Sequence, residues 1–210
     1  MAFFSRNGRG QAPSQIPIPS VEPFKSLGMQ ALFHSLKPEK KYSVLDLGSG
    51  AGSTIEYLTQ FSSRIRVADL FHSLTEHGLC RPDSQPVDGA AIAGTLSIPD
   101  TERFDIVLCW DLPNFFCREE FAALVKYLDG YCVPGTFFFA ICSTLKEVPA
   151  IPLSYKVEGS ELLLYSTGST ETRACPRFTP RELTQLLPHY GAHSSYILRN
   201  GMQEYLFVHR

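Results

Sequence analysis

The sequence lacks the features that place a protein in a membrane or in an oxidising compartment. No apolar run approaches the length of a membrane span, and Met1–Phe4 is too short for the core of a signal peptide. The six cysteines include no Cys-x-x-Cys pair, and Cys109 and Cys142 lie in apolar runs typical of buried strands. We therefore expect a cytoplasmic protein with reduced, buried thiols.

An excess of charge of one sign is also missing. The formal net charge is −2, and the 19 Lys and Arg residues are scattered along the chain. Composition therefore gives no support to a nucleic-acid partner, whose phosphate backbone selects for clustered positive charge. His72 and His77 are spaced too far apart to share a helix face and have no third ligand at suitable spacing, so we expect no metal site.

The length and the apolar content of the chain indicate one folded unit. With 210 residues, of which 44% are hydrophobic, the sequence fits a single α/β domain of ordinary core size. Residues 1–20 are rich in Gly, Pro, Ser and Gln and contain no acidic residue. This composition predicts a flexible tail at 1–20 and a single domain at 21–210.

The stretch 44–54 organises the rest of the chain. An apolar run ends in the turn Gly48-Ser49-Gly50-Ala51-Gly52, and a helical pattern begins at Ser53. This order predicts a binding crevice at the carboxyl end of a strand, because glycine lets a ligand approach the backbone and the first N–H groups of the helix face it. A dinucleotide fingerprint would have its third glycine at position 53, where this chain has serine.

The pattern from Val44 to Gly52 resembles the first motif of the class I S-adenosylmethionine-dependent methyltransferases, written apolar-apolar-Asp/Glu-apolar-Gly-x-Gly-x-Gly. The resemblance implies a three-layer α/β fold with a seven-stranded, mostly parallel sheet and a reversed C-terminal strand. It also implies S-adenosyl-L-methionine as cofactor, with the turn wrapped around its methionine part. The cofactor-binding residues that it assigns here are Asp46, Gly48, Ser49, Gly50 and Gly52.

Asp69 ends the second predicted strand, Arg64–Asp69, where a carboxylate can accept both ribose hydroxyls of an adenosine ligand. Leu70 would then be an apolar neighbour of the adenine, together with Phe71. We expect residues 90–96 to form the third strand. Members of the family often end this strand with an acidic residue, whereas this chain has Thr95, Leu96 and Ser97. The adenine contact is then left to a backbone group or to Ser97, with Leu96 beside it.

The apolar run 104–110 predicts the fourth strand. In the resembled family, the loop after this strand reaches the sulfonium and the acceptor, which implies roles there for Asp111, Leu112 and Asn114. Asp111-x-Pro113 matches two positions of the Asp/Asn-Pro-Pro-aromatic motif of amino-group methyltransferases, but Leu112 replaces the first proline and Asn114 the aromatic residue. Proline after a strand is also common turn chemistry.

Periodicity and turn residues predict the remaining elements. The pattern at 153–168 predicts an inserted hairpin. In the resembled family, such insertions cover the acceptor site or form homodimer contacts. Asn200-Gly201 predicts a final hairpin, which supplies the reversed strand. Further predicted elements are helices at 24–36, 54–61, 72–77, 119–128 and 179–187 and a strand at 136–141.

The expected function is methyl transfer to a small molecule. Positioning the reactants and excluding water supply most of the acceleration of such a reaction, so we assign no catalytic base. Two other classes stay open. A pseudo-enzyme that serves as an interaction module is favoured by the missing acid near Thr95. A nicotinamide-dependent oxidoreductase is disfavoured by Ser53 and by the final hairpin.

Overall fold

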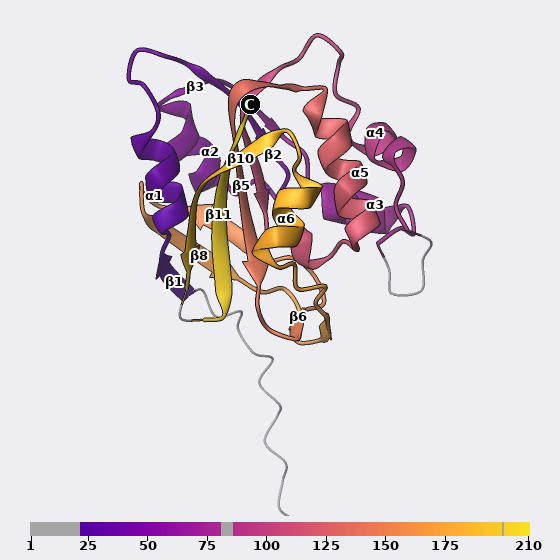
Figure 1. Ribbon diagram of the computed structural model, residues 1–210. Coiled ribbons are helices and arrows are strands. Elements are labelled where there is room, and N and C mark those ends of the chain that lie inside the picture. The colour runs from indigo at the N-terminus through magenta and orange to yellow at the C-terminus, as the bar shows by residue number, and fades with distance from the viewer. Residues whose placement is uncertain (1–21, 81–85, 199) are drawn as a thin grey trace, which may run out of the picture.

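The computed structural model describes residues 22–80, 86–198 and 200–210, so the tail predicted at 1–20 lies outside the described residues. At its centre is a six-stranded mixed sheet in the order β10-β11-β5-β4-β2-β3 (Figure 1). The strands are β2 (Tyr42–Asp46), β3 (Ser62–Val67), β4 (Phe104–Trp110), β5 (Cys132–Ser143), β10 (Tyr190–Ile197) and β11 (Met202–His209). The predicted α/β class is confirmed, and so is the reversed C-terminal strand, because β11 runs antiparallel to β5.

Helices cover both faces of this sheet (Figure 1). In β4, Ile106 and Leu108 pack on one face and Val107 and Cys109 on the other, as strand alternation requires. Each face therefore has its own hydrophobic layer. One contains α1 (Leu27–His34) and α2 (Gly52–Thr59). The other contains α3 (Leu70–Glu76), α4 (Gly89–Leu96), α5 (Arg118–Asp129) and α6 (Pro180–Leu186).

The predicted third strand is wrong, because residues 90–96 lie in helix α4. The segment is rich in alanine, the strongest helix former. The Asp88 side chain accepts a hydrogen bond from Ala91 N at 2.8 Å and caps the first turn, and Ser97 ends the helix with φ 43°. In the described part of the chain, the sheet therefore has six strands instead of the predicted seven, and β3 lies at its edge.

The predicted helix at 24–36 also begins later than expected. Phe24 belongs to a short strand, β1 (Glu22–Lys25), and Ser26 caps α1. Strand β1 pairs with β8 (Leu162–Ser166), which pairs with β7 (Ser154–Val157), and these three strands form a second sheet. A third, two-stranded sheet joins β6 (Glu147–Pro149) to β9 (Thr172–Ala174), and Leu112–Asn114 forms the 3-10 turn η1.

A buried carboxylate joins the first helix to the last strand. Glu204 of β11 is fully buried and accepts hydrogen bonds from Ser26 Oγ and from Gly28 N, the latter at 2.8 Å. Burial raises the pKa of Glu204, and these hydrogen bonds oppose that effect. The N-terminus of α1 is thereby fixed against a strand 176 residues away in sequence.

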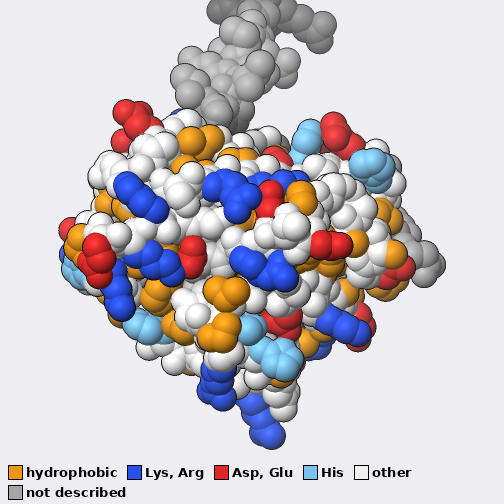
Figure 2. All heavy atoms as spheres, turned by 90° about the horizontal axis from the view of Figure 1, so that it is seen from above, with side chains coloured by type: hydrophobic (Ala, Val, Ile, Leu, Met, Phe, Trp, Pro, Cys, Tyr) orange, Lys and Arg blue, Asp and Glu red, His pale blue; other side chains and the backbone are white. Residues whose placement is uncertain are grey.

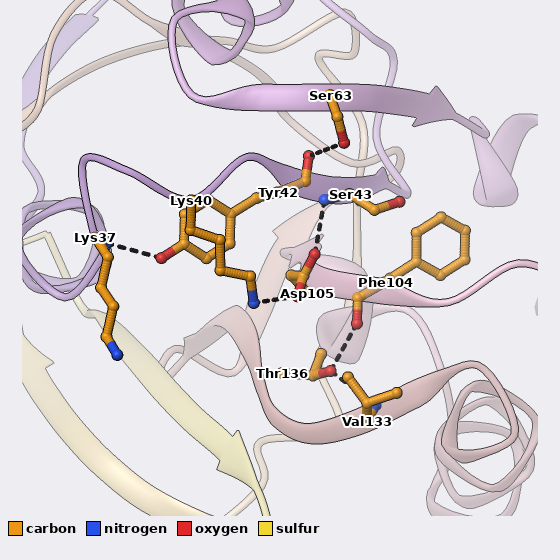
Figure 3. A network of polar contacts seen from close by, with 9 residues as sticks. All are labelled: Lys37, Lys40, Tyr42, Ser43, Ser63, Phe104, Asp105, Val133 and Thr136. Carbon is orange, nitrogen blue, oxygen red and sulfur yellow. Dashed lines mark hydrogen bonds and ion pairs between the residues drawn. The ribbon is translucent and has the colours of Figure 1, made fainter.

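A polar network ties together the beginnings of the parallel strands (Figure 3). Asp105 of β4 accepts hydrogen bonds from Ser43 N of β2 at 2.9 Å and from Lys40 Nζ at 2.6 Å. Thr136 Oγ1 of β5 donates to Phe104 O at 2.6 Å. Three neighbouring strands are therefore linked by side chains at the end of the sheet opposite to their carboxyl ends.

The surface at this end of the sheet carries both signs of charge. In Figure 2, Lys and Arg side chains are interspersed with Asp and Glu, and no large area of that face is of one sign. Among the described residues, no helix is both long and apolar enough to span a bilayer.

We predict that Asp105→Ala lowers the free energy of unfolding by about 1–2 kcal/mol, because Ser43 N loses its acceptor in a half-buried position. Asp105→Asn is the matched control. It keeps an acceptor oxygen but weakens the ion pair with the half-exposed Lys40, so it should cost under about 1 kcal/mol. Urea denaturation measures both variants, and equal losses would show that the Ser43 hydrogen bond contributes nothing.

Candidate functional site

A cavity of about 360 Å³ opens at the carboxyl ends of β2, β3 and β4. Strand β2 lies between β3 and β4, so the order of the strands in the sheet reverses at β2. Ligands of open α/β sheets usually bind at such a switch point. We call this cavity the first cavity. Its lining comes from five segments of the chain: Leu47–Ser49; Asp69, Phe71, His72 and Thr75; Trp110–Leu112; Ile151–Ser154; and Ser166–Gly168.

Asp46 shapes the glycine turn from beneath. Its side chain is almost fully buried, and Oδ1 accepts hydrogen bonds from Gly48 N at 2.9 Å and from Trp110 Nε1 at 2.6 Å. Burial raises the pKa of Asp46, while the Trp110 and Gly48 hydrogen bonds act in the opposite direction by stabilising the charged form. Asp46 lines neither cavity described here, so it holds the turn in place instead of facing a ligand directly.

Neighbouring side chains leave no room for a Cβ at two glycines of the turn. A Cβ at position 48 would lie 2.7 Å from Cδ1 of Trp110. Gly50 has φ +64°, and a Cβ there would lie 2.5 Å from Cγ1 of Val67. Gly52 has open space around it. The turn therefore rests directly on the Trp110 indole and on Val67.

Trp110 lines the first cavity, although no motif of the sequence points to it. It has φ 52°, a left-handed conformation that is uncommon for a bulky residue and often marks functional sites. Its ring stacks on Tyr155 of β7, with centroids 5.2 Å apart and planes at 7°. Two features of the sequence could have indicated a role for Trp110. It is the only tryptophan of the chain, and it stands at the end of an apolar run.

Asp69 lies between two cavities. It caps α3 by accepting a hydrogen bond from His72 N at 3.1 Å, and it lines both the first cavity and a second one of about 610 Å³. The second cavity runs between the free edge of β3 and the end of α4, and Leu70 and Leu96 lie in its wall. The predicted residues for the ribose and for the adenine therefore lie side by side.

Asp111 is the most deeply buried carboxylate of the first cavity. Its side chain is 3% exposed, and Oδ2 accepts a hydrogen bond from Leu153 N at 3.0 Å. Burial raises the pKa of Asp111 from its ordinary value of 3.8 to about 7, although this hydrogen bond acts in the opposite direction. Leu112 also lines the cavity, but Asn114 instead bridges Ile141 O and Ser143 N of β5.

Strands β7 and β8 cover the glycine turn, and we call them and their flanking loops, residues 150–168, the roof. Ser154 Oγ lies 3.2 Å from Ser49 Oγ, and Val157 N donates to Thr54 Oγ1 of α2 at 3.0 Å. The sequence predicted the hairpin strands but not which part of the crevice they cover. The contacts that decide this join residues about 100 positions apart.

Within the described residues, no side chain caps the N-terminus of helix α2, which follows the turn. Side chains cap α1, α3, α4 and α6. The first N–H groups of α2 are therefore available for a negatively charged ligand group next to Gly48 and Ser49.

Similarity to known proteins is detectable only in structure. No family profile matches the sequence, and no curated protein matches it either. An S-adenosylmethionine-dependent methyltransferase from Clostridium acetobutylicum superposes with a TM-score of 0.53 at 12% identity, over 86% of this chain and 89% of that one. CalS10, an amino pentose methyltransferase from Micromonospora echinaspora with bound SAM, gives 0.50 at 14% identity, over 86% and 88%. This likeness shows that the chain has the class I methyltransferase fold.

We predict that the free energy of unfolding falls as pH rises from about 4 to about 7, because folded Asp111 keeps a proton that the unfolded chain releases in this range. Asp111→Asn removes this contribution and should be the more stable protein at pH 8. At about 1.4 kcal/mol per pKa unit, the upper limit of the gain is about 4 kcal/mol. Urea denaturation at several pH values measures it, with the exposed Asp100→Asn as control. Parallel pH profiles for wild type and Asp111→Asn would contradict the buried, protonated state.

Gly50→Ala should lower the free energy of unfolding by about 1–3 kcal/mol, because the left-handed backbone and the contact with Val67 both oppose a Cβ. Gly52→Ala is the matched control in the same turn. It has open space and a helical position, so its stability should stay within about 1 kcal/mol of wild type. Thermal denaturation compares the two variants, and a reversed order would refute this description of the turn.

Proposed function

We propose that this protein is an S-adenosylmethionine-dependent methyltransferase that acts on a small molecule. The observation that carries the proposal is that, in this fold, Gly48 and Ser49 of the glycine turn and Asp69 line one cavity under the roof. Each feature alone is common in nucleotide-binding folds. Together they line one cavity under the roof, and their spacing fits a ligand with an adenosine part and an amino-acid part.

The residues present fit this cofactor. The Gly48–Ser49 backbone and the uncapped start of α2 would bind its carboxylate end, and the Asp69 carboxylate would accept the ribose hydroxyls. The second cavity, beside Leu70 and Leu96, would take the adenine. The first cavity alone falls within the usual range of small-molecule sites, about 300–1,000 Å³. When bound, the cofactor supplies a methyl group activated by a sulfonium.

The chain contributes positioning and exclusion of water. The roof covers the crevice with Ile151, Pro152 and Leu153, which are apolar and would keep water from the reacting centre. Trp110 and Asp46 fix the glycine turn, so the cofactor position is set before binding. No nucleophilic side chain is needed, since the acceptor itself attacks the methyl carbon.

The structural neighbours support the class of reaction. Two whose overall fold this chain shares are described as methyltransferases, and one of them acts on an amino pentose, a small molecule.

We predict micromolar binding of S-adenosylmethionine and of S-adenosylhomocysteine, measured by calorimetry. Trp110 lines the cavity and is the only tryptophan, so its fluorescence should change on binding. Asp69→Asn keeps a good helix cap but loses the charged, two-oxygen acceptor, and affinity should drop at least tenfold. The exposed Asp100→Asn should bind like wild type.

Other outcomes separate the alternative functions. Absence of binding by the folded protein would overturn the cofactor assignment and favour an interaction module. Binding of a nicotinamide cofactor with a change in Trp110 fluorescence would favour an oxidoreductase. Tight binding of S-adenosylmethionine without transfer to any compound of a broad acceptor screen would indicate a pseudo-enzyme.

A further inference from the structure

The central sheet ends in two edge strands, β3 and β10, and their free edges are protected differently. An edge strand presents backbone N–H and C=O groups to which a strand of another molecule can add. Strand β3 carries Arg64 and Arg66, which both form ion pairs with Glu102. Arg66 also donates to Leu96 O and Ser97 O at 3.1 and 3.0 Å, so the end of α4 is held against β3. Charged side chains and a helix therefore protect the β3 edge.

The second half of β10, residues 194–197, has no comparable protection among the residues that the structure describes. This segment contains no charged residue and no proline, and no described strand pairs with its outer edge. A bulge between Ala192 and Ser194 disturbs only the first half of the strand. Ser195 is exposed, and Ile197 is 79% exposed, more than any other large hydrophobic residue described. The second half of β10 is therefore open to another strand.

The backbone groups of this half-strand alternate in direction. Leu198 N donates to Met202 O at 2.8 Å, so the backbone of Leu198 faces the β11 side of the hairpin. In an antiparallel pair, such residues alternate with residues whose N–H and C=O groups point away from the partner strand. The backbone of Tyr196 therefore faces β11, whereas Ser195 and Ile197 direct their backbone groups out of the sheet. The two outward-facing residues lie one on each side of Tyr196.

We propose that β10 is a homodimer interface, at which its second half pairs antiparallel with β10 of a second copy of this chain. A twofold axis at Tyr196 places Ser195 of each copy opposite Ile197 of the other. Each of these two pairs can exchange two hydrogen bonds, so every outward-facing backbone group of both residues finds a partner. The two six-stranded sheets then form one continuous sheet. This inference does not depend on the proposed function.

The side chains also suit a second copy. Tyr196 lies opposite Glu204 and Ile197 opposite Gln203 of β11, so consecutive side chains of β10 point to opposite faces of the sheet. At the axis, the two Tyr196 residues occupy a non-hydrogen-bonded pair, where side chains approach most closely and aromatic pairs are favourable. On the other face, Ile197 of each copy packs beside Ser195 of the other and loses contact with water.

The expected dimer is weak and leaves the site open. One short strand pair buries less surface than the 1,200–2,000 Å² that is typical of stable complexes, so we expect a dissociation constant on the order of micromolar. Strands β11 and β5 lie between β10 and β4, which places the interface away from the first cavity. Ligand binding and dimerisation can therefore be measured independently.

The first test is analytical ultracentrifugation of the full chain from about 1 to about 200 μM. The wild type should approach twice the mass of one chain. Ile197→Lys places a charge on the edge, and Ser195→Pro removes an outward N–H, so each should weaken dimerisation at least tenfold. Leu162→Lys is the matched control. Leu162 is also exposed, at 41%, but it lies on β8 in the roof, and the dimer should persist. Circular dichroism verifies that each variant is folded.

The second test addresses the twofold axis. In Tyr196→Cys, the two thiols would lie at a non-hydrogen-bonded pair with Cα atoms about 4.5 Å apart, which suits a disulfide. Oxidation with diamide should therefore give a covalent dimer on a non-reducing gel. His193→Cys is the matched control, because His193 is exposed on the same strand but its two copies would be about 20 Å apart. This variant should stay monomeric on the gel.

Several results would overturn the inference. These are a wild-type protein that is monomeric at about 200 μM, a dimer that persists in both Ile197→Lys and Ser195→Pro, and equal cross-linking of the two cysteine variants. Dissociation by Leu162→Lys alone would also overturn it and place the interface at the roof. None of these results bears on S-adenosylmethionine binding, whose absence would overturn the proposed function instead.

Discussion

The hydrogen bonds of one buried carboxylate hold the crevice together. Asp46 ends β2 inside the core and accepts from the backbone of Gly48 and from the indole of Trp110, so strand, turn and neighbouring strand are fixed by a single side chain. The indole in turn leaves no room for a side chain at position 48 and carries the stacked ring of Tyr155 from the roof. Without Asp46, the floor and the cover of the cavity would lose their common support.

The two carboxylates that open onto the cavity have different environments and so suit different tasks. Asp69 is partly exposed at the start of α3, and its carboxylate accepts a hydrogen bond from His72 N. Asp111 is enclosed by apolar residues and neutral titratable groups, and burial raises its pKa to about 7. A fixed negative charge can bind hydroxyl groups, and a group that changes protonation near neutral pH can move a proton. The fold separates the two by placing them after different strands.

Local patterns in the sequence predicted the parts of the site that depend on nearby residues. The turn at Gly48–Gly52 is predicted by the glycine spacing and Asp69 by the end of a strand, and Gly48, Ser49 and Asp69 line the same cavity. The short apolar run at 90–96 is compatible with either a strand or a helix. In the structure it forms helix α4, whose first turn is stabilised by the Asp88 cap. The roles of Trp110 and Asn114 depend on contacts across 64 and 27–29 positions, which no local pattern encodes.

The burial of Glu204 against Ser26 and Gly28 also constrains the order in which this chain can fold. Strand β11 lies between β5 and β10, so the sheet is incomplete until the last hairpin has formed. Helix α1 is synthesised before β11, yet its buried partner is Glu204, 176 positions after Gly28. Such non-local pairing is slow and leaves apolar sheet surface exposed for longer. On the ribosome, the hydrophobic layer that contains α1 and α2 can therefore close only after residue 204 has been synthesised.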